Sequence, residues 1–265
     1  MQLWQIGGNV KRRARRAARL RSVGTLELRI CRTIKTGYRH EFQGAEMAVK
    51  MKIDFVSDVS CPWCVIGLKS LESALAKLGG EVEADIHFQP FELNPKMGPT
   101  GQDIAEHIAQ KYGSGPSDIE RSRNAIRARG AELGFTFDMQ KRGRIYNTFD
   151  AHRLLHWAEG EGKQKALKNA LFTAYFTEGR NPSDHGVLAD VASSVGLDAA
   201  RAAQILDSDE YAAEVRAREQ FYTSRGINAV PSVIINDRHL IRGGQPAEIF
   251  EQTLKELAGE AHESA

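Results

Sequence analysis

Two cysteines separated by two residues are the part of this sequence best suited to chemistry. They are Cys61 and Cys64, with Pro62 and Trp63 between them. Two thiols at this spacing can close a small disulfide, and opening it again moves two electrons to or from another pair of sulfurs. Half of a structural zinc site has the same spacing, so the surrounding residues must distinguish the two kinds of site.

The residues on either side of the pair predict a strand and then a helix. Residues 52–56 are short, mostly apolar and rich in β-prone residues, as in a buried strand. Pro62 suits the first position of a helix, and the residues after it are apolar at helical spacing: Val65, Leu68, Leu71, Leu75 and Leu78. Cys61 is then expected at the helix N-terminus, where free N–H groups and the helix dipole favour a thiolate. We therefore expect Cys61 to attack a substrate sulfur and the less exposed Cys64 to resolve the mixed disulfide.

A zinc site would need two further ligands, and the sequence offers few. The third cysteine, Cys31, lies in an unrelated basic segment. His152 and His156 are four residues apart in an expected helix, so a Cys2His2 site is the zinc alternative. The order strand, Cys-x-x-Cys, helix is typical of a redox motif, and it favours redox chemistry without a metal.

The charges are distributed unevenly along the 265 residues of the chain. Residues 1–50 carry 12 Lys and Arg against 3 Asp and Glu, whereas the rest of the chain carries 24 against 31. Residues 1–50 are therefore expected to be a disordered basic extension, with the folded part beginning near Met47 or Met51. A transit peptide and a nucleic-acid-binding arm are alternative interpretations. No apolar run could span a membrane or serve as a secretory signal, so we expect a cytoplasmic protein with no membrane partner and no nucleic-acid partner.

The remaining sequence predicts a small α/β domain interrupted by a long helical segment. Residues 83–91 predict a second strand, and helical patterns occupy about 102–225. Residues 232–236 and 239–242 predict a β-hairpin, and Pro246 begins a last helix. The expected parts are the extension, the first half of the α/β domain, the helical insertion and the second half, at residues 1–50, 51–101, 102–225 and 226–265.

With these elements in place, the sequence resembles the thioredoxin superfamily, and more narrowly the DsbA-like oxidoreductases of the FrnE type. The motifs that carry the resemblance are residues 54–64, 91–95, 147–154, 174–176, 226–232 and 243–246. It covers about Met51 to Leu257, whereas residues 1–46 match nothing in the family. It implies a thioredoxin fold with an all-helical insertion between its βαβ half and its ββα half. We expect the insertion to wall a groove over the cysteines.

The resemblance implies three catalytic residues. Cys61 and Cys64 are the redox pair, and Pro231 is the cis-proline that faces it. The backbone of Val230 is then expected to pair with an extended substrate. The family's usual glycine before the Val-Pro pair is Ala229 here.

Other residues are candidates for substrate binding or proton transfer. Trp63 is expected to be exposed as a substrate platform, and it replaces the histidine of the DsbA enzymes, so a milder oxidant is expected. Asn147 and His152 belong to a motif that by resemblance faces the groove, although a hydrogen-bonded core histidine is the alternative for His152. Asp54 resembles the buried acid that relays protons in thioredoxins, with a strand-end acid as the alternative.

The predicted function is that of a thiol–disulfide oxidoreductase that oxidises, reduces or isomerises protein disulfides. Its expected partners are protein or small-molecule thiols and disulfides, with no cofactor beyond the redox-active disulfide and with glutathione as a candidate co-substrate. The alternative is a glutathione-dependent isomerase or transferase, of the 2-hydroxychromene-2-carboxylate isomerase or kappa-class type. Those relatives generally carry serine where this chain has Cys61. A binding module built on basic residues 11–21 is the non-enzymatic alternative.

Overall fold

A parallel β-α-β unit forms the first half of the sheet domain. The computed structural model describes residues 48–263, so most of the expected extension over residues 1–50 lies outside the described residues. Strand β1 (Val49–Ser57) leads into helix α1 (Pro62–Lys77), and β2 (Val82–Pro90) pairs with β1 in parallel. Strand β1 begins three residues before the predicted strand and ends one residue after it, and β2 is shifted by one residue from its predicted position.

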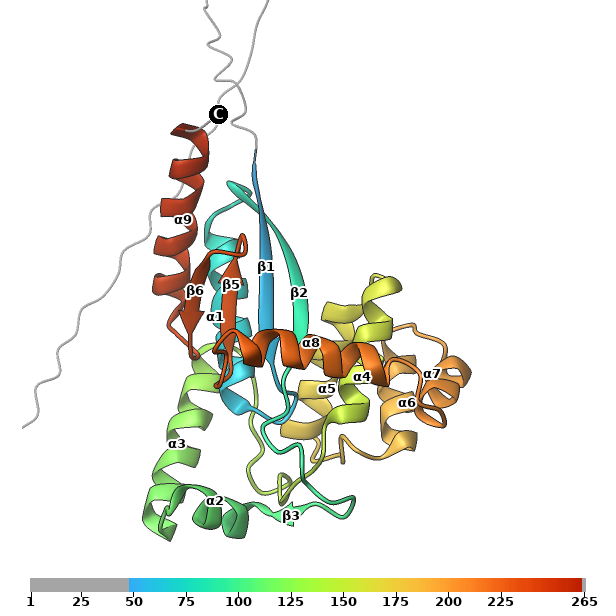
Figure 1. The fold of residues 1–265 in the computed structure, drawn as a ribbon. Helices are drawn as coiled ribbons and strands as arrows, with labels where there is room; N and C mark the ends of the chain where they lie inside the picture. The colour runs from blue at the N-terminus through green and yellow to red at the C-terminus, as the bar shows by residue number, and fades with distance from the viewer. Residues whose placement is uncertain (1–47, 264–265) are drawn as a thin grey trace, which may run out of the picture. The chain divides into compact units, whose positions relative to one another are not determined.

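The second half of the domain completes the sheet from the other end of the chain. Strand β5 (Ser232–Ile235) pairs antiparallel with β1, and β6 (His239–Arg242) forms a hairpin with β5. The strand order is β2-β1-β5-β6, and helix α9 (Ala247–Glu263) follows the hairpin. Figure 1 shows this sheet with α8 crossing one face and α1 behind the other. This is the predicted α/β thioredoxin fold, with β1 at its centre.

The insertion between β2 and β5 is helical except for a small ribbon. Strand β3 (Gln102–Asp103) pairs antiparallel with β4 (Arg144–Ile145), which corrects the prediction of helix throughout residues 102–225. Helical periodicity stops after residue 132 because turn-forming residues follow, among them Gly134 and Asp138, whose carboxylate accepts two backbone N–H groups. The helices are α2 (Ile104–Tyr112), α3 (Pro116–Glu132), α4 (Phe149–Gly160), α5 (Gln164–Phe176), α6 (His185–Ser194), α7 (Ala199–Leu206) and α8 (Ala212–Ser224).

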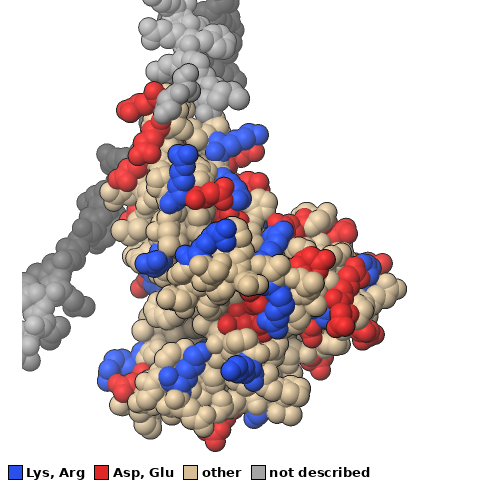
Figure 2. All heavy atoms as spheres, viewed as in Figure 1, with Lys and Arg blue, Asp and Glu red and all other residues tan. Residues whose placement is uncertain are grey.

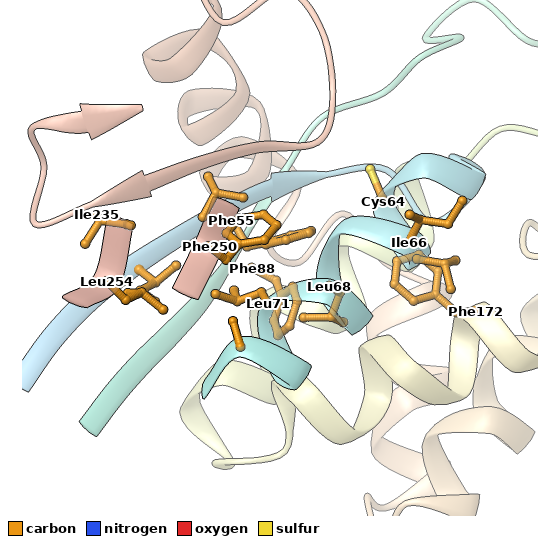
Figure 3. Packing of buried hydrophobic residues seen from close by; sticks show 14 of the residues in the cluster. Phe55, Cys64, Ile66, Leu68, Leu71, Phe88, Phe172, Ile235, Phe250 and Leu254 are labelled. Carbon is orange, nitrogen blue, oxygen red and sulfur yellow. The ribbon is translucent and has the colours of Figure 1, made fainter. Parts of the chain in front are cut away.

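The main hydrophobic core joins the sheet, helices α1 and α9, and the insertion. Phe55 of β1 packs with Phe88 of β2 and with Phe250 of α9, and Phe172 of α5 reaches Ile66 at the start of α1 (Figure 3). A second core lies among helices α4 to α7. Because the insertion shares the main core, it is packed on the beginning of α1, where the cysteines lie.

The surface of the described residues is mixed in charge. Figure 2 shows Lys and Arg side chains intermixed with Asp and Glu over the face in view. None of the helices between residues 48 and 263 combines the length and the apolar character that a membrane span requires.

Candidate active site

The two cysteines lie at the N-terminal end of α1, as the sequence predicts. Cys61 is the N-cap residue with extended backbone angles, and Pro62 takes the first helical position. The backbone N–H of Cys64 donates to the carbonyl of Cys61 at 3.1 Å, which begins the first turn. Cys61 retains 4% exposure and Cys64 none. Cys61 is thus the sulfur nearer to solvent.

The surroundings of the two sulfurs shift their pKa values in opposite directions. The Cys64 side chain donates a hydrogen bond to the Cys61 sulfur, and this bond, with help from the backbone at Trp63 and Cys64, lowers the Cys61 pKa. Burial and the charge of Asp58 oppose that shift without reversing it. Burial, followed by the interaction with Cys61, raises the pKa of Cys64 well above the usual thiol value. The pair therefore loses its first proton at Cys61, which is the arrangement expected of an attacking sulfur.

Pro231 stands across from the start of α1, and its bond to Val230 is cis, as predicted. The Cys61 thiol lies 3.7 Å from the backbone oxygen of Val230, to which it donates. The proline ring faces Gly67, where an added Cβ would lie 3.0 Å from Pro231 Cγ. The Val230–Pro231 segment therefore borders the nucleophilic sulfur directly.

Trp63 is 41% exposed, which confirms its predicted position on the surface. Its backbone oxygen and its ring lie against Gly244, where an added Cβ would be 2.9 Å from the oxygen and 3.4 Å from the ring. The turn after β6 thus needs glycine there so that the indole can lie beside the redox pair. A platform role in substrate binding stays a prediction.

The turn that carries Cys61 is held from two sides. The Asp58 carboxylate accepts the N–H of Ser60 at 2.9 Å and that of Leu93, in the loop after β2, at 2.7 Å. The Arg142 guanidinium, from the loop before β4, donates to the Ser60 carbonyl at 3.2 Å. The insertion therefore reaches the redox turn, as expected, although a groove over the thiols stays a prediction.

His152 lies behind the active-site turn, which corrects the expectation that it faces an open groove. It is 3% exposed, and its Nε2 is 4.0 Å from Asp58 Oδ1 with no hydrogen-bond partner among residues 48–263. Burial is the main cause that lowers its pKa well below the usual value, so the ring is neutral near pH 7. His152 is positioned to pack beneath the turn.

The zinc alternative finds no support in the described part of the chain. His156 packs its ring against Tyr211, with centroids 5.1 Å apart. Residues 48–263 contain no group of three or more His, Cys, Asp or Glu side chains that could hold a metal ion.

Asn147 has a structural setting away from the sulfurs. Its Oδ1 accepts the N–H of Phe149 at 2.8 Å, at the start of α4, and its Nδ2 donates to Glu92 Oε1 at 3.1 Å. Glu92 also pairs with Arg216 of α8. Asn147 therefore joins α4 to the loop after β2, and the groove position expected for it is corrected.

Asp54 faces away from the thiols, which corrects the expectation of an acid beneath them. Side chains alternate along a strand, so Phe55 faces α1 while Asp54 faces α8. There Asp54 accepts a hydrogen bond from Gln89 at 2.7 Å and pairs with Lys52 at 3.0 Å. It lines a polar cavity of about 310 Å³ together with Tyr222 of α8.

Lys168 is the residue near the pair that the sequence reasoning missed. It lies in α5, is completely buried, and its Nζ is 5.1 Å from the ring centroid of Phe172. Burial lowers the pKa of Lys168, and among the groups that act in the opposite direction Cys64 comes first, followed by Asp58 and Cys61. A signal existed: Lys168 shares one helical face with the apolar residues Leu171, Phe172 and Tyr175. Lysine on such a face is buried with them.

Comparisons with known proteins agree with this geometry. The family model of the DSBA-like thioredoxin domain matches residues 52–255. The uncharacterized protein YwbO of Bacillus subtilis (strain 168) is 28% identical over 211 residues, covering 79% of this chain and 98% of YwbO. The crystal structure of a probable DsbA oxidoreductase from Streptomyces coelicolor is 31% identical, with a TM-score of 0.75 over 79% of this chain and 91% of that one.

More distant structures share the fold alone. A 2-hydroxychromene-2-carboxylate isomerase is 16% identical, with a TM-score of 0.59 over 81% of this chain and 99% of that one. The cytosolic disulfide reductase DsbM from Pseudomonas aeruginosa, solved with glutathione, is 17% identical, with a TM-score of 0.55 over 78% of this chain and 98% of that one. Since the family model spans most of the sequence and the Streptomyces structure aligns over nearly all its length, this chain belongs to the DSBA-like thioredoxin domain family.

Proposed function

We propose that this chain is a thiol–disulfide oxidoreductase that acts through Cys61 and Cys64. The observation that supports it most is the difference between the two sulfurs. The sulfur with the lowered pKa sits at the helix N-terminus beside the Val230 carbonyl, and the one with the raised pKa is buried a turn away. Membership of a DsbA-like family supports the same class of chemistry.

The reaction follows from this asymmetry. The Cys61 thiolate attacks one sulfur of a substrate disulfide, a bond forms between them, and the other substrate sulfur leaves with the electron pair as a thiolate. Cys64 then loses its proton and attacks Cys61, which closes the Cys61–Cys64 disulfide and releases the second substrate thiolate. The reverse sequence oxidises a dithiol. In isomerisation, another thiolate of the substrate attacks the substrate sulfur of the mixed disulfide, which forms a new substrate disulfide and releases the Cys61 thiolate.

Substrate contacts are proposed from the surroundings of Cys61. The backbone of Val230 lies beside the sulfur and offers an extended substrate a place to pair, as a strand adds to a sheet edge. The exposed indole of Trp63 supplies an apolar surface next to it. Glutathione is the proposed small-thiol partner, because the related fold of DsbM was solved with it. A cytoplasmic location, expected from the sequence, is part of the proposal and can be tested by cell fractionation.

The decisive experiment replaces each cysteine in turn and follows reduction of oxidised glutathione and of a peptide disulfide. Cys61→Ser is expected to abolish exchange, because no nucleophile remains. Cys64→Ser is expected to accumulate a mixed disulfide on Cys61, visible by mass spectrometry, because attack survives and resolution does not. Below neutral pH, iodoacetamide should alkylate Cys61 faster than Cys64, because only Cys61 has a lowered pKa.

The same material tests the alternative. Exchange activity that survives Cys61→Ser, or equal alkylation rates at both sulfurs, would remove the basis of the proposed mechanism. A glutathione transferase would conjugate glutathione to a small electrophile, and neither a transferase nor an isomerase of this type would need Cys64. That activity rests on shared fold alone, because this chain carries Cys61 where those relatives generally have serine.

A further inference from the structure

A buried lysine without a hydrogen-bond partner lies beside the redox pair. Lys168 has no exposed surface, and its Nζ finds no partner among residues 48–263. Its nearest described neighbours include the rings of Phe172 and Phe88, with centroids 5.1 and 6.0 Å from Nζ. Burying an ammonium group without a partner costs several kcal/mol. The packing of the core alone would be satisfied by an apolar side chain at this position.

The groups that face Lys168 belong to the active site. Cys64 and Cys61 act on it from α1, Asp58 from the turn before α1, and His152 from α4. The neighbouring residue on its helix, Phe172, packs on Ile66 of the cysteine helix (Figure 3). Lys168 therefore faces the buried side of the pair, where Cys64 lies.

Cys64 is the thiol whose deprotonation requires a nearby base. It must become a thiolate to attack the mixed disulfide, yet burial raises its pKa well above the usual value. Asp58 is occupied on both carboxylate oxygens by the N–H groups of Ser60 and Leu93. Asp54 lies on the other face of the sheet, bonded to Gln89. His152 Nε2 and Lys168 Nζ are both buried without a partner among the described residues, but of these two only Lys168 acts on the charge of Cys64.

We propose that Lys168 controls the protonation of Cys64 during resolution of the mixed disulfide. As the Cys64 thiol loses its proton, the Lys168 amine takes one up, and the Cys64 sulfur attacks Cys61. A bond forms between the two cysteine sulfurs, the bond from Cys61 to the substrate sulfur breaks, and the electron pair leaves with the substrate thiolate. The products are the Cys61–Cys64 disulfide and the Lys168 ammonium. This role rests on the proposed function of the pair.

The electrostatics of the site fit this sequence of events. Burial lowers the pKa of Lys168 to about 8, so part of the lysine is a neutral amine near physiological pH. Negative charge on Cys64, Asp58 and Cys61 favours its ammonium form. When Cys61 is tied up in a mixed disulfide, its negative charge is lost, so the amine is favoured at the step that needs a base.

The test uses 5,5′-dithiobis(2-nitrobenzoate) as the disulfide and follows absorbance at the thionitrobenzoate band. All chains in this test carry Cys31→Ser, so that only Cys61 and Cys64 react. The first release then reports attack by Cys61, and the second reports resolution by Cys64. In Lys168→Met, we expect the second release at pH 7 to slow by about tenfold, and its pH dependence to move upward by about one unit. The first release should change far less. The same second-phase pH profile in this variant as in the native chain would overturn the proposal.

Two controls separate this role from the function of the pair. Lys165→Met removes a partly exposed lysine of the same helix, which pairs with Glu72, and should leave both phases unchanged. Cys64→Ser should abolish the second release. A native chain without a second release would disprove the two-cysteine mechanism itself, whereas a normal second release in Lys168→Met disproves only the role of Lys168.

A measurement on the native chain keeps the test valid if Lys168→Met folds poorly. The Lys168 ¹³Cε resonance can be followed against pH in the reduced and in the oxidised chain. Its midpoint should lie well below that of ordinary lysines, and lower still after oxidation, because the sulfur anions are then absent. A midpoint near the usual lysine value of about 10.4, or one that oxidation leaves unmoved, would overturn the proposal.

Discussion

Gly67 leaves room for Pro231 beside the redox pair, and this contact can be tested directly. In Gly67→Ala, the new Cβ would lie 3.0 Å from Pro231 Cγ and 3.5 Å from Gly244 Cα, so the proline ring or α1 would have to move away. Overpacking costs about 1–3 kcal/mol, which exceeds the gain of about 0.5–1 kcal/mol that alanine brings inside a helix. We expect a lower free energy of unfolding in urea and slower disulfide exchange.

A glycine in open space provides the matched control. Gly259 lies in α9, and an added Cβ would have no atom within 4 Å. Gly259→Ala should therefore stabilise the protein by about 0.5–1 kcal/mol. Equal stabilisation by both substitutions would show that Pro231 does not press on α1.

The residues of the site differ in how far sequence could predict them. Cys61, Cys64 and Pro231 could be placed because their neighbours have a strong local pattern. Asp54 could not, because a shift of one residue along a strand moves a side chain to the opposite face, and Phe55 takes the inner one. Lys168 was missed because its significance depends on α1, more than a hundred residues earlier in the chain.

At the scale of elements, Arg153 connects α4 to the end of α7 and to the turn before α8. It is 4% exposed, and its guanidinium donates to the carbonyls of Ile205, Ser208 and Glu210 and to the carboxylate of Asp150. Lysine cannot reproduce this planar set of donors, so Arg153→Lys leaves buried carbonyls unpaired. We expect a loss of about 1–3 kcal/mol and faster amide hydrogen exchange at residues 205–211.

Arg201→Lys is the control for this prediction. Arg201 pairs with Glu210 nearby, but both side chains are 36% exposed, so Arg201→Lys should lower the free energy of unfolding much less than Arg153→Lys. A similar cost for both substitutions would show that burial adds nothing to the bonds of Arg153.

Elements with many repeats of their pattern were predicted, and short ones were not. The apolar stripes of α1, α5 and α9 and the β-branched run of β5 extend over enough residues to fix their type. The ribbon β3–β4 has two residues in each strand, and Gln102 pairs with Ile145 across a long interval. Nothing periodic can mark such a strand, because its formation depends on the distant partner.

At the scale of the whole molecule, the buried charge of Lys168 should lower stability. Its pKa falls from 10.5 in the unfolded chain to about 8 in the folded one, so the unfolded state binds more protons between these values. The contribution of Lys168 to stability is therefore most favourable above pH 10.5 and becomes less favourable by about 3 kcal/mol as pH drops to 8. Lys168→Met should raise the unfolding free energy at pH 7 by up to that amount, and the gain should disappear toward pH 10.5.

Denaturant titrations at several pH values measure this gain. His152 gives the free energy of unfolding a second dependence on pH. Because the pKa of His152 is depressed in the folded chain, the unfolded state alone gains a proton as pH falls below about 6.5, and stability declines there. The native chain and Lys168→Met should therefore be compared above pH 7, where His152 is neutral in the folded and in the unfolded state. A gain from Lys168→Met that is the same at pH 7 and pH 10.5 would contradict a buried charge.

The sheet order has a consequence for synthesis on the ribosome. The central strand β1 is made before the helical insertion, but its partner β5, paired through Ile53 with Ile235, emerges only after it. Until then one edge of β1 has no neighbour in the sheet, and Cys61 lacks the Val230 carbonyl that borders it in the finished fold. A nascent chain thus carries its reactive sulfur and an open, aggregation-prone strand edge through most of its translation. Chains released before residue 232 should be insoluble and should react indiscriminately with thiol reagents, because the strand that covers this edge of β1 is then missing.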